Sequence, residues 1–302
     1  MKSIFIGTDD FAVPILRKVR EKTDLMLVIT QPPRPKGRGL KETPTPVNTE
    51  ADNLGLKVLT PEKIREVTGI IRDLNPDIIV LASYGQIIPR EILEIPKIGA
   101  LNVHPSLLPK YRGATPIQSA LMNGERITGV TIMWMNEFLD AGDIFLQKEI
   151  EIDDEDDYGS LKDKLIRLSV ELIDKAIDMI KDGRIVRIPQ DESKATYTKP
   201  IRKEDTIIDW NKSASEIVNL IRALSPTPGA IAKIGDNQYK IYRAKVVEHI
   251  EGEPGKVVVK DPKKGELVVA TGKGGVYIIE IQPENKKRMN VKDFLLGYGG
   301  KI

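Results

Sequence analysis

Short runs of apolar residues without polar alternation are the feature that most restricts the fold of this chain. Helix-like segments separate the first of these runs from one another. A strand that is apolar on both faces needs helices on both sides of its sheet, and such sheets are mostly parallel. The pattern therefore predicts an α/β fold whose first part is a doubly wound, mostly parallel sheet. The runs span residues 2–6, 25–29, 77–81, 100–103 and 130–135.

The pattern changes after residue 183. Apolar residues at helical spacing predict one long helix over 158–181, which Gly183 ends. The next residues, 184–205, are polar and irregular, and we interpret them as an ordered linker. A short helix over 214–224 and several short strands with glycine-rich turns follow, which is typical of a small, OB-like β-barrel. We therefore predict a first domain over 1–183 and a barrel domain over 206–302. The barrel strands are expected at 230–234, 239–247, 256–259, 267–270 and 276–281.

Composition excludes several kinds of site. None of the 302 residues is cysteine, which removes disulfides, thiolate metal sites and cysteine nucleophiles and fits a reducing, cytoplasmic location. No apolar run approaches the length of a membrane span. Residues 200–302 hold 18 Lys and Arg against 13 Asp and Glu, a net charge of +5, whereas the whole chain carries +2. This imbalance favours a polyanionic partner for the C-terminal part.

The densest polar cluster lies between residues 101 and 143. Asn102 and His104 are two positions apart on a predicted strand, so both side chains point to the same face. Asp140 follows the next predicted strand. An amide, an imidazole and a carboxylate at adjacent strand ends could polarise a carbonyl and move a proton. The alternative is a hydrogen-bonded pair inside a core, and the residues alone only slightly favour catalysis.

Several motifs resemble the folate-dependent formyltransferase family, and in particular its members that act on initiator tRNA. The central ones are LNVHPSLLPKYRGA at 101–114 and LDAGD at 139–143. Their order along the chain also matches. Supporting matches are IFIGTDDFAVP at 4–14, QPPRPKGRG at 31–39, LASYGQIIP at 81–89, IDW at 208–210, IRAL at 221–224 and PGA at 228–230.

The resemblance implies a Rossmann-like catalytic domain, a C-terminal tRNA-binding barrel and a reaction. A formyl group would pass from 10-formyltetrahydrofolate, the co-substrate, to the amino group of methionine on initiator tRNA. Asn102, His104 and Asp140 take the catalytic positions of the family, and no metal is needed. The positions implied for binding folate are Tyr84, Gly85, Ile87, Ile88, Pro89, Ser106, Leu107, Leu108, Pro109 and Gly142.

A basic segment precedes the second helix-like stretch. Between Pro32 and Pro46 it holds five prolines and two glycines, so it can be neither a regular helix nor a central strand. Its cations are Arg34, Lys36, Arg38 and Lys41, and the family match implies that they contact the acceptor end of tRNA, whereas a solvated loop is the alternative. Barrel cations that could add contacts are Lys203, Lys240, Arg243, Lys245 and Lys287.

Other functions remain open from the residues. A formyltransferase for a nucleotide-sugar amine or glycinamide ribonucleotide, or a formyltetrahydrofolate hydrolase, would share the three catalytic positions. A non-catalytic tRNA-binding protein would not need all three. A nicotinamide dehydrogenase would need a glycine fingerprint, which residues 7–10 lack. Nothing in the sequence indicates an obligate interface, and we expect a monomer.

Overall fold

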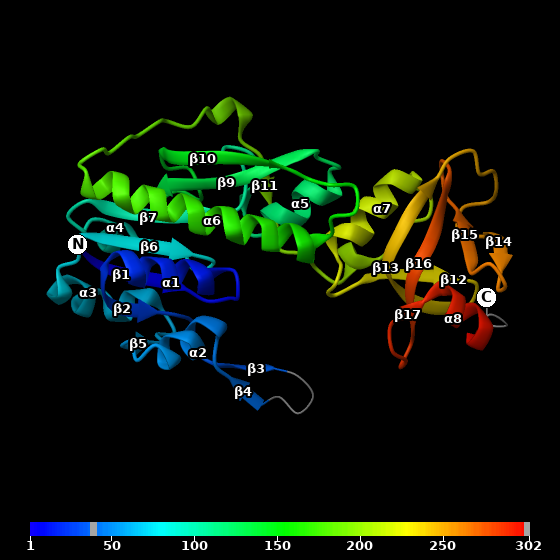
Figure 1. The fold of residues 1–302 in the computed structure, drawn as a ribbon, viewed down its shortest axis with the longest axis horizontal. Helices are drawn as coiled ribbons and strands as arrows, with labels where there is room; N and C mark the ends of the chain where they lie inside the picture. Colours follow the sequence, from blue (N-terminus) through cyan, green and yellow to red (C-terminus); the bar gives the residue numbers. More distant parts are fainter. Residues whose placement is uncertain (37–40, 299–302) are drawn as a thin grey trace. The chain divides into compact units, whose positions relative to one another are not determined.

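The computed structural model describes residues 1–36 and 41–298 and contains two compact units. Unit 1 comprises residues 1–116, 128–150 and 162–198. Unit 2 comprises residues 117–127, 151–161 and 199 onward. Each unit is built around its own sheet (Figure 1).

Unit 1 contains the predicted parallel sheet, with seven strands. The predicted apolar runs coincide with β1, β2, β6, β7 and β9, of which β1, β2, β6 and β7 pair in parallel. The exception is β9, which runs antiparallel to β7. The mostly parallel prediction is confirmed. The strand order is β10 (Ile144–Glu151), β9 (Ile127–Trp134), β7 (Gly99–His104), β6 (Ile78–Ala82), β1 (Lys2–Gly7), β2 (Asp24–Ile29) and β5 (Val58–Leu59).

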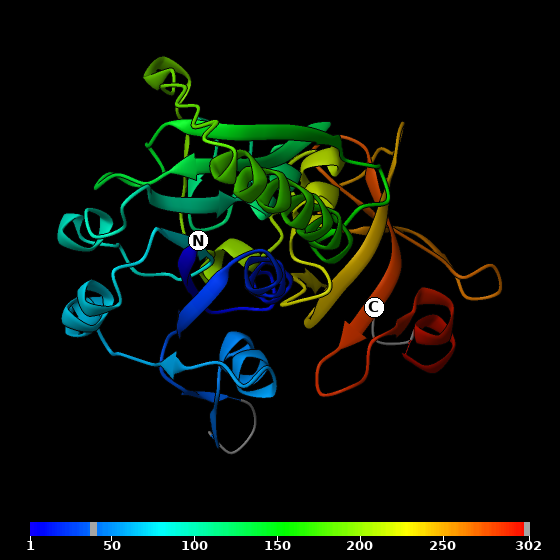
Figure 2. The ribbon, with the colours of Figure 1, turned by 60° about the vertical axis from the view of Figure 1, so that its left-hand side comes forward.

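Helices cover both faces of this sheet. The helices α1 (Ala12–Lys22) and α6 (Tyr158–Lys181) lie together on one face, where the Lys22 ammonium pairs with Asp174 at 3.2 Å and Asp178 at 2.8 Å. On the other face, Ile4 and Ile6 of β1 share a core with η1 (Ile64–Val67), α3 (Thr68–Leu74) and α4 (Arg90–Leu93). Figure 2 shows the two groups on opposite sides of the strands. Every residue of β6 is buried, as a strand covered on both faces requires.

The antiparallel direction of β9 determines how Asp140 reaches the sheet. Because β9 runs back along β7, its last residue, Trp134, pairs with Leu101 rather than with the end of β7. Residues 135–143 therefore turn back before β10 begins. Two bonds fix this turn: Met135 N donates to Ala100 O and Trp134 N donates to Asp143 O, both at 2.8 Å.

Shorter elements complete unit 1. A small hairpin of β3 (Arg34–Lys36) and β4 (Lys41–Thr43) stands apart from the main sheet and precedes α2 (Pro46–Asn53). The two residues of β8 (Arg112–Gly113) pair in parallel with β11 (Tyr197–Thr198), which follows η2 (Glu192–Lys194). Helix α5 (Pro116–Met122) begins at the boundary of the unit.

Unit 2 is built around an antiparallel sheet, in agreement with the predicted small barrel, and also includes residues 117–122 of α5. After η3 (Glu204–Thr206), helix α7 (Ala214–Ala223) begins with a capping box, in which Ser213 and Glu216 bond each other's backbone N–H. Its residues Ile217 and Ile221 share a core with Phe294 of α8 (Val291–Tyr298). The sheet order is β12 (Ala230–Ile234), β13 (Asn237–Val247), β16 (Gly275–Pro283), β15 (Glu266–Ala270) and β14 (Val257–Asp261), with β17 (Met289–Asn290) beside β16.

Candidate active site

Asn102 and His104 lie at the carboxyl end of β7, where a parallel sheet presents its binding crevice. Their alternation along the strand puts both side chains on one face. Both are almost completely buried, with exposed fractions of 7% and 4%. Buried polar groups need partners, so their contacts define the site.

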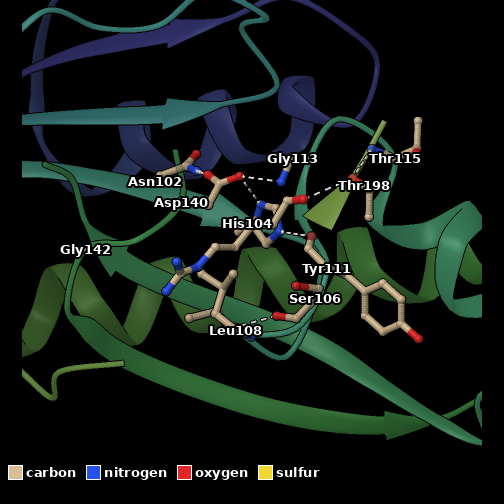
Figure 3. A network of polar contacts seen from close by, with 12 residues as sticks. Asn102, His104, Ser106, Leu108, Tyr111, Gly113, Thr115, Asp140, Gly142 and Thr198 are labelled. Carbon is tan, nitrogen blue, oxygen red and sulfur yellow. Dashed lines mark hydrogen bonds and ion pairs between the residues drawn. The ribbon is translucent and has the colours of Figure 1, made fainter. Parts of the chain in front are cut away.

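Asp140 provides the partner for both side chains (Figure 3). Asn102 Nδ2 donates to Asp140 Oδ1 at 3.2 Å, and His104 Nδ1 lies 3.7 Å from Asp140 Oδ2. The backbone N–H of Gly113 also donates to Oδ2, at 2.8 Å. Three nitrogens therefore face this carboxyl group, whose oxygens accept from Asn102 and Gly113.

The ring of His104 is oriented by its other nitrogen. Nε2 lies 3.0 Å from the carbonyl oxygen of Tyr111. Because a carbonyl can only accept, Nε2 carries a hydrogen and donates it. Nδ1 is thereby left facing Asp140, and it is the nitrogen that a reacting group between the two side chains would meet.

The loop after His104 is held at several points. Ser106 Oγ donates to Lys110 O at 2.7 Å and closes the loop on itself. Leu108 N donates to Thr131 Oγ1 at 3.2 Å, and Gln147 Nε2 donates to Leu108 O at 2.9 Å. These contacts connect the loop to β9 and β10 and thereby fix the carbonyl of Tyr111.

Two glycines are required by close packing at the site. A Cβ at Gly113 would lie 2.7 Å from Thr198 O, and its φ of +107° disfavours any side chain. A Cβ at Gly142 would lie 1.7 Å from Trp134 O. The turn that carries Asp140 therefore packs directly on the backbone of β9.

The residues implied for folate binding lie in the loops that follow β6, β7 and β9. In the loop after β6, Tyr84 and Ile88 are buried, and they belong to the cluster on which Met135 of the 135–143 loop packs. The exposed apolar residues of these loops are Ile87, Phe138 and Leu139, with exposed fractions of 75%, 66% and 52%. Of the remaining implied positions, Gly85 has a positive φ, Pro89 precedes α4, Leu107 is half-buried, and Pro109 O accepts from Thr196 N.

Three of the four cations predicted to contact tRNA belong to β3 and β4. Arg34 and Lys36 are the end residues of β3, and Lys41 begins β4 opposite Lys36. Arg38 lies outside the described residues. In unit 2, Arg243 and Lys245 both pair with Glu155, at 3.1 and 2.8 Å, and Lys240 donates to Pro228 O. Lys203 and Lys287 are exposed.

Residues 190–198, which fall in the predicted linker, contact the site directly. Gln190 donates to the backbone of the Asp140 turn, and Thr196 Oγ1 accepts from Tyr111 N at 2.8 Å. Thr198 Oγ1 donates to Arg112 O at 3.1 Å. Sequence analysis did not identify these residues, because a polar segment without periodicity gives no local sign of such contacts. The one sequence feature that could have indicated these contacts was Arg112, a charged residue inside the motif that follows His104.

The described ranges, 1–36 and 41–298, contain neither a metal-binding cluster nor a membrane-spanning helix. No group of three or more His, Cys, Asp or Glu side chains in these ranges could hold a metal ion. No helix within them is long and apolar enough to cross a membrane.

Two protein-family comparisons cover both units. A family described as formyl transferase matches residues 1–177, and one described as formyl transferase, C-terminal domain, matches residues 200–299. The chain therefore belongs to the formyl transferase family, and the family resemblance found in the sequence is confirmed.

Curated relatives match nearly the whole chain. The methionyl-tRNA formyltransferase of Caldanaerobacter subterraneus subsp. tengcongensis is 42% identical over 302 residues, covering 99% of this chain and 97% of the relative. The protein of the same name from Sulfurihydrogenibium sp. is 47% identical over 303 residues, with the same two coverages.

Solved structures share the fold. WlaRD, a sugar 3N-formyl transferase crystallised with dTDP and 5-N-formyl-THF, superposes with a TM-score of 0.69 at 21% identity, over 95% of this chain and 99% of that one. HypX from Aquifex aeolicus in complex with tetrahydrofolic acid gives a TM-score of 0.64 at 20% identity, over 98% of this chain and 47% of that one.

Proposed function

We propose that this protein transfers the formyl group of 10-formyltetrahydrofolate to the amino group of methionine esterified to initiator tRNA. The proposal rests on the convergence of Asn102, His104 and Asp140. Relatives named methionyl-tRNA formyltransferase also match nearly the whole chain. In this reaction the amine nitrogen bonds to the formyl carbon, and the bond from that carbon to N10 of the folate breaks. The amine loses a proton, and the folate nitrogen gains one.

Two side chains are suited to stabilise the charge that forms on the formyl oxygen. Asn102 uses one amide hydrogen on Asp140 and has a second to donate. His104, when charged, donates from Nδ1 while Nε2 remains bonded to Tyr111 O. Both groups are held before the reaction begins, and preorganised donors of this kind contribute most to catalysis of acyl transfer.

Asp140 is suited to move the proton. Its Oδ2 lies 3.7 Å from His104 Nδ1, which is longer than a hydrogen bond and leaves both atoms able to contact a water or the amine. The carboxylate would pass the proton of the amine through a water. Gly113 N keeps the carboxylate in place during this transfer.

The loops after β6 and β9 support the assignment of folate as the formyl donor. They leave Ile87, Phe138 and Leu139 exposed beside a shared core, and apolar side chains of this kind suit a flat heterocycle. Folate would supply the formyl carbon. Tyr84, Gly85, residues 87–89, residues 106–109 and Gly142 would bind it, with Gly85 permitting close approach of the backbone.

Cations support the assignment of tRNA as the acceptor. Arg34, Lys36, Arg38 and Lys41 fall within eight consecutive residues of the sequence, and residues 200–302 carry a net charge of +5. Such groups would meet the phosphates of the acceptor end and of its flank.

A direct assay separates this function from its alternatives. We expect the purified protein to form formyl-methionyl-tRNA from 10-formyltetrahydrofolate and charged initiator tRNA. His104→Ala should abolish transfer, whereas His249→Ala, at a side chain that is 94% exposed, should retain it. Release of formate without an acceptor would favour a hydrolase, transfer to an amino sugar nucleotide would favour the sugar enzymes, and tRNA binding without either reaction would favour a binding protein.

A further inference from the structure

The turn that carries Asp140 adopts a backbone conformation that needs external support. Asp140 has a φ of +47°, in the left-handed region that residues other than glycine rarely adopt. Two residues later, Gly142 packs on the carbonyl of Trp134. The carboxylate has its own partners, but these do not hold the backbone of the turn. Strained residues of this kind persist only where surrounding contacts fix them.

A single side chain from a distant part of the sequence provides that support. Gln190 Nε2 donates to Asp140 O at 2.8 Å and to Gly142 O at 2.7 Å. One amide group thus holds both carbonyls that flank the centre of the turn. Gln190 is separated from them by 50 and 48 residues.

Arg112 fixes the direction of this amide. Gln190 Oε1 accepts from Arg112 Nε at 3.2 Å and from Nη2 at 2.8 Å. A guanidinium can only donate and a carbonyl can only accept, so only this orientation of the amide satisfies all four contacts. The amide therefore acts as a bridge of defined polarity between Arg112 and the Asp140 turn.

Arg112 is itself anchored within the site. Its side chain is 1% exposed, and it makes a two-pronged pair with Glu192, with Nη2–Oε1 and Nη1–Oε2 distances of 2.6 and 2.9 Å. Its neighbour Gly113 donates to the carboxylate of Asp140. The loop that contains Arg112 and Gly113 therefore holds the side chain of Asp140 directly. The same loop holds the backbone of Asp140 through Gln190.

We propose that Gln190 is a positioning residue for the transfer reaction, oriented by Arg112 and acting through Asp140. The inference rests on the proposed function, in which Asp140 moves the proton. It assigns Gln190 and Glu192 to the active site, although they follow the long helix and lie just before and at the start of η2.

Two substitutions separate positioning from simple anchoring. Gln190→Met keeps the length of the side chain and removes both polar atoms. Gln190→Glu keeps the pairing with Arg112 but replaces the donating Nε2 with an oxygen. This oxygen would face the carbonyl oxygens of Asp140 and Gly142, which repel it. If Gln190 only anchors its segment to Arg112, Gln190→Glu should behave as the wild type.

We expect both variants to lower kcat for formyl transfer by about 10- to 100-fold, as a small misplacement of a reacting group does, with KM values within about twofold. Lys194→Ala is the matched control, because this exposed side chain of the same segment pairs only with Asp191 among the described contacts. Its kcat should equal that of the wild type. An unchanged kcat in Gln190→Glu would overturn the proposal.

A second measurement does not depend on activity. The chain has two histidines, so the NMR spectrum of the histidine Cε1–H groups holds one signal from His104 and one from the exposed His249. Gln190→Glu should shift the His104 signal and leave that of His249 in place, and Lys194→Ala should shift neither. A His104 signal that stays in place would overturn the proposal. If the wild type transfers no formyl group, the proposed function fails, and the NMR comparison still tests the contact.

Discussion

The backbone N–H of Gly113 donates a 2.8 Å hydrogen bond to the carboxylate of Asp140, 27 residues further along the chain. This bond joins the loop that follows His104 to the turn that carries Asp140. A backbone donor has no rotamers, so the position of the carboxylate is determined by the fold. The predictions below follow from this rigidity and from the groups around it.

Asn102→Ala tests the proposed oxyanion donor. The substitution removes the amide that faces Asp140 and the reacting carbon, and we expect kcat to fall by about 100-fold or more, as on loss of such donors elsewhere. Steady-state kinetics of formyl transfer measure the effect. Asn53→Ala, at an exposed residue that ends α2, should be neutral. Nearly full turnover in the Asn102 variant would remove this residue from the mechanism.

Gly142→Ala tests the packing of the Asp140 turn. The added methyl group would lie 1.7 Å from Trp134 O, so the turn must move. We expect kcat to fall by about 10- to 100-fold and the free energy of unfolding to fall by about 1–3 kcal/mol.

The matched control is Gly69→Ala in α3, where a Cβ meets nothing within 4 Å. Alanine is the better helix former, so this variant should gain about 0.5–1 kcal/mol in the free energy of unfolding and keep its turnover. Equal kinetics in the two alanine variants would contradict the predicted role of the turn.

Tyr84→Phe should change the alkaline stability of the protein. The hydroxyl of Tyr84 is buried and has no hydrogen-bond partner among the described residues, and burial raises the pKa of its phenol to about 12. The folded state therefore keeps the proton above pH 10, where the unfolded chain loses it. The stability linked to this group is complete below pH 10 and falls as the pH rises to about 12.

Denaturant unfolding at pH 8 and pH 11.5 measures this effect. The loss of unfolding free energy for the wild type should exceed that for Tyr84→Phe by about 2 kcal/mol, since one pKa unit corresponds to about 1.4 kcal/mol. At pH 8 the phenylalanine variant should be at least as stable, because it removes an unsatisfied hydroxyl. Parallel losses in the two proteins would show that Tyr84 keeps an ordinary phenol.

The affinity for tRNA should depend steeply on salt. Each phosphate contact releases counterions, so the logarithm of the binding constant should fall linearly with the logarithm of salt concentration. Arg34→Gln should reduce the magnitude of the slope by about one. Lys148→Gln, at a lysine that pairs with Glu171, should leave the slope unchanged. A flat profile between about 50 and 200 mM salt would count against tRNA as the acceptor.

The sheet and the Asn102–His104 pair could be predicted because their signals are local. A strand buried on both faces is apolar at every position, and a spacing of two on a strand defines a face. The long helix was predicted with the bounds it has, Tyr158–Lys181, because its apolar stripe is continuous.

The rest of the site depends on contacts that have no local signature. The antiparallel direction of β9 cannot be recognised from its apolar residues, yet it forces the chain to turn back before Asp140. The burial of Arg112 depends on Gln190 and Glu192, some 80 residues later. A glutamine in a polar segment has the same appearance in the sequence whether it contacts solvent or an active site.

The pairing of β8 with β11 limits how this enzyme can be divided. A fragment cut after Gly183 would hold every residue of the Asn102, His104 and Asp140 cluster and would lack the amide and hydroxyl groups that hold its loops. A fragment cut after Thr198 would retain them. A different C-terminal segment could therefore be joined without loss of these contacts only beyond Thr198, and residues 184–198 would have to stay with the first unit.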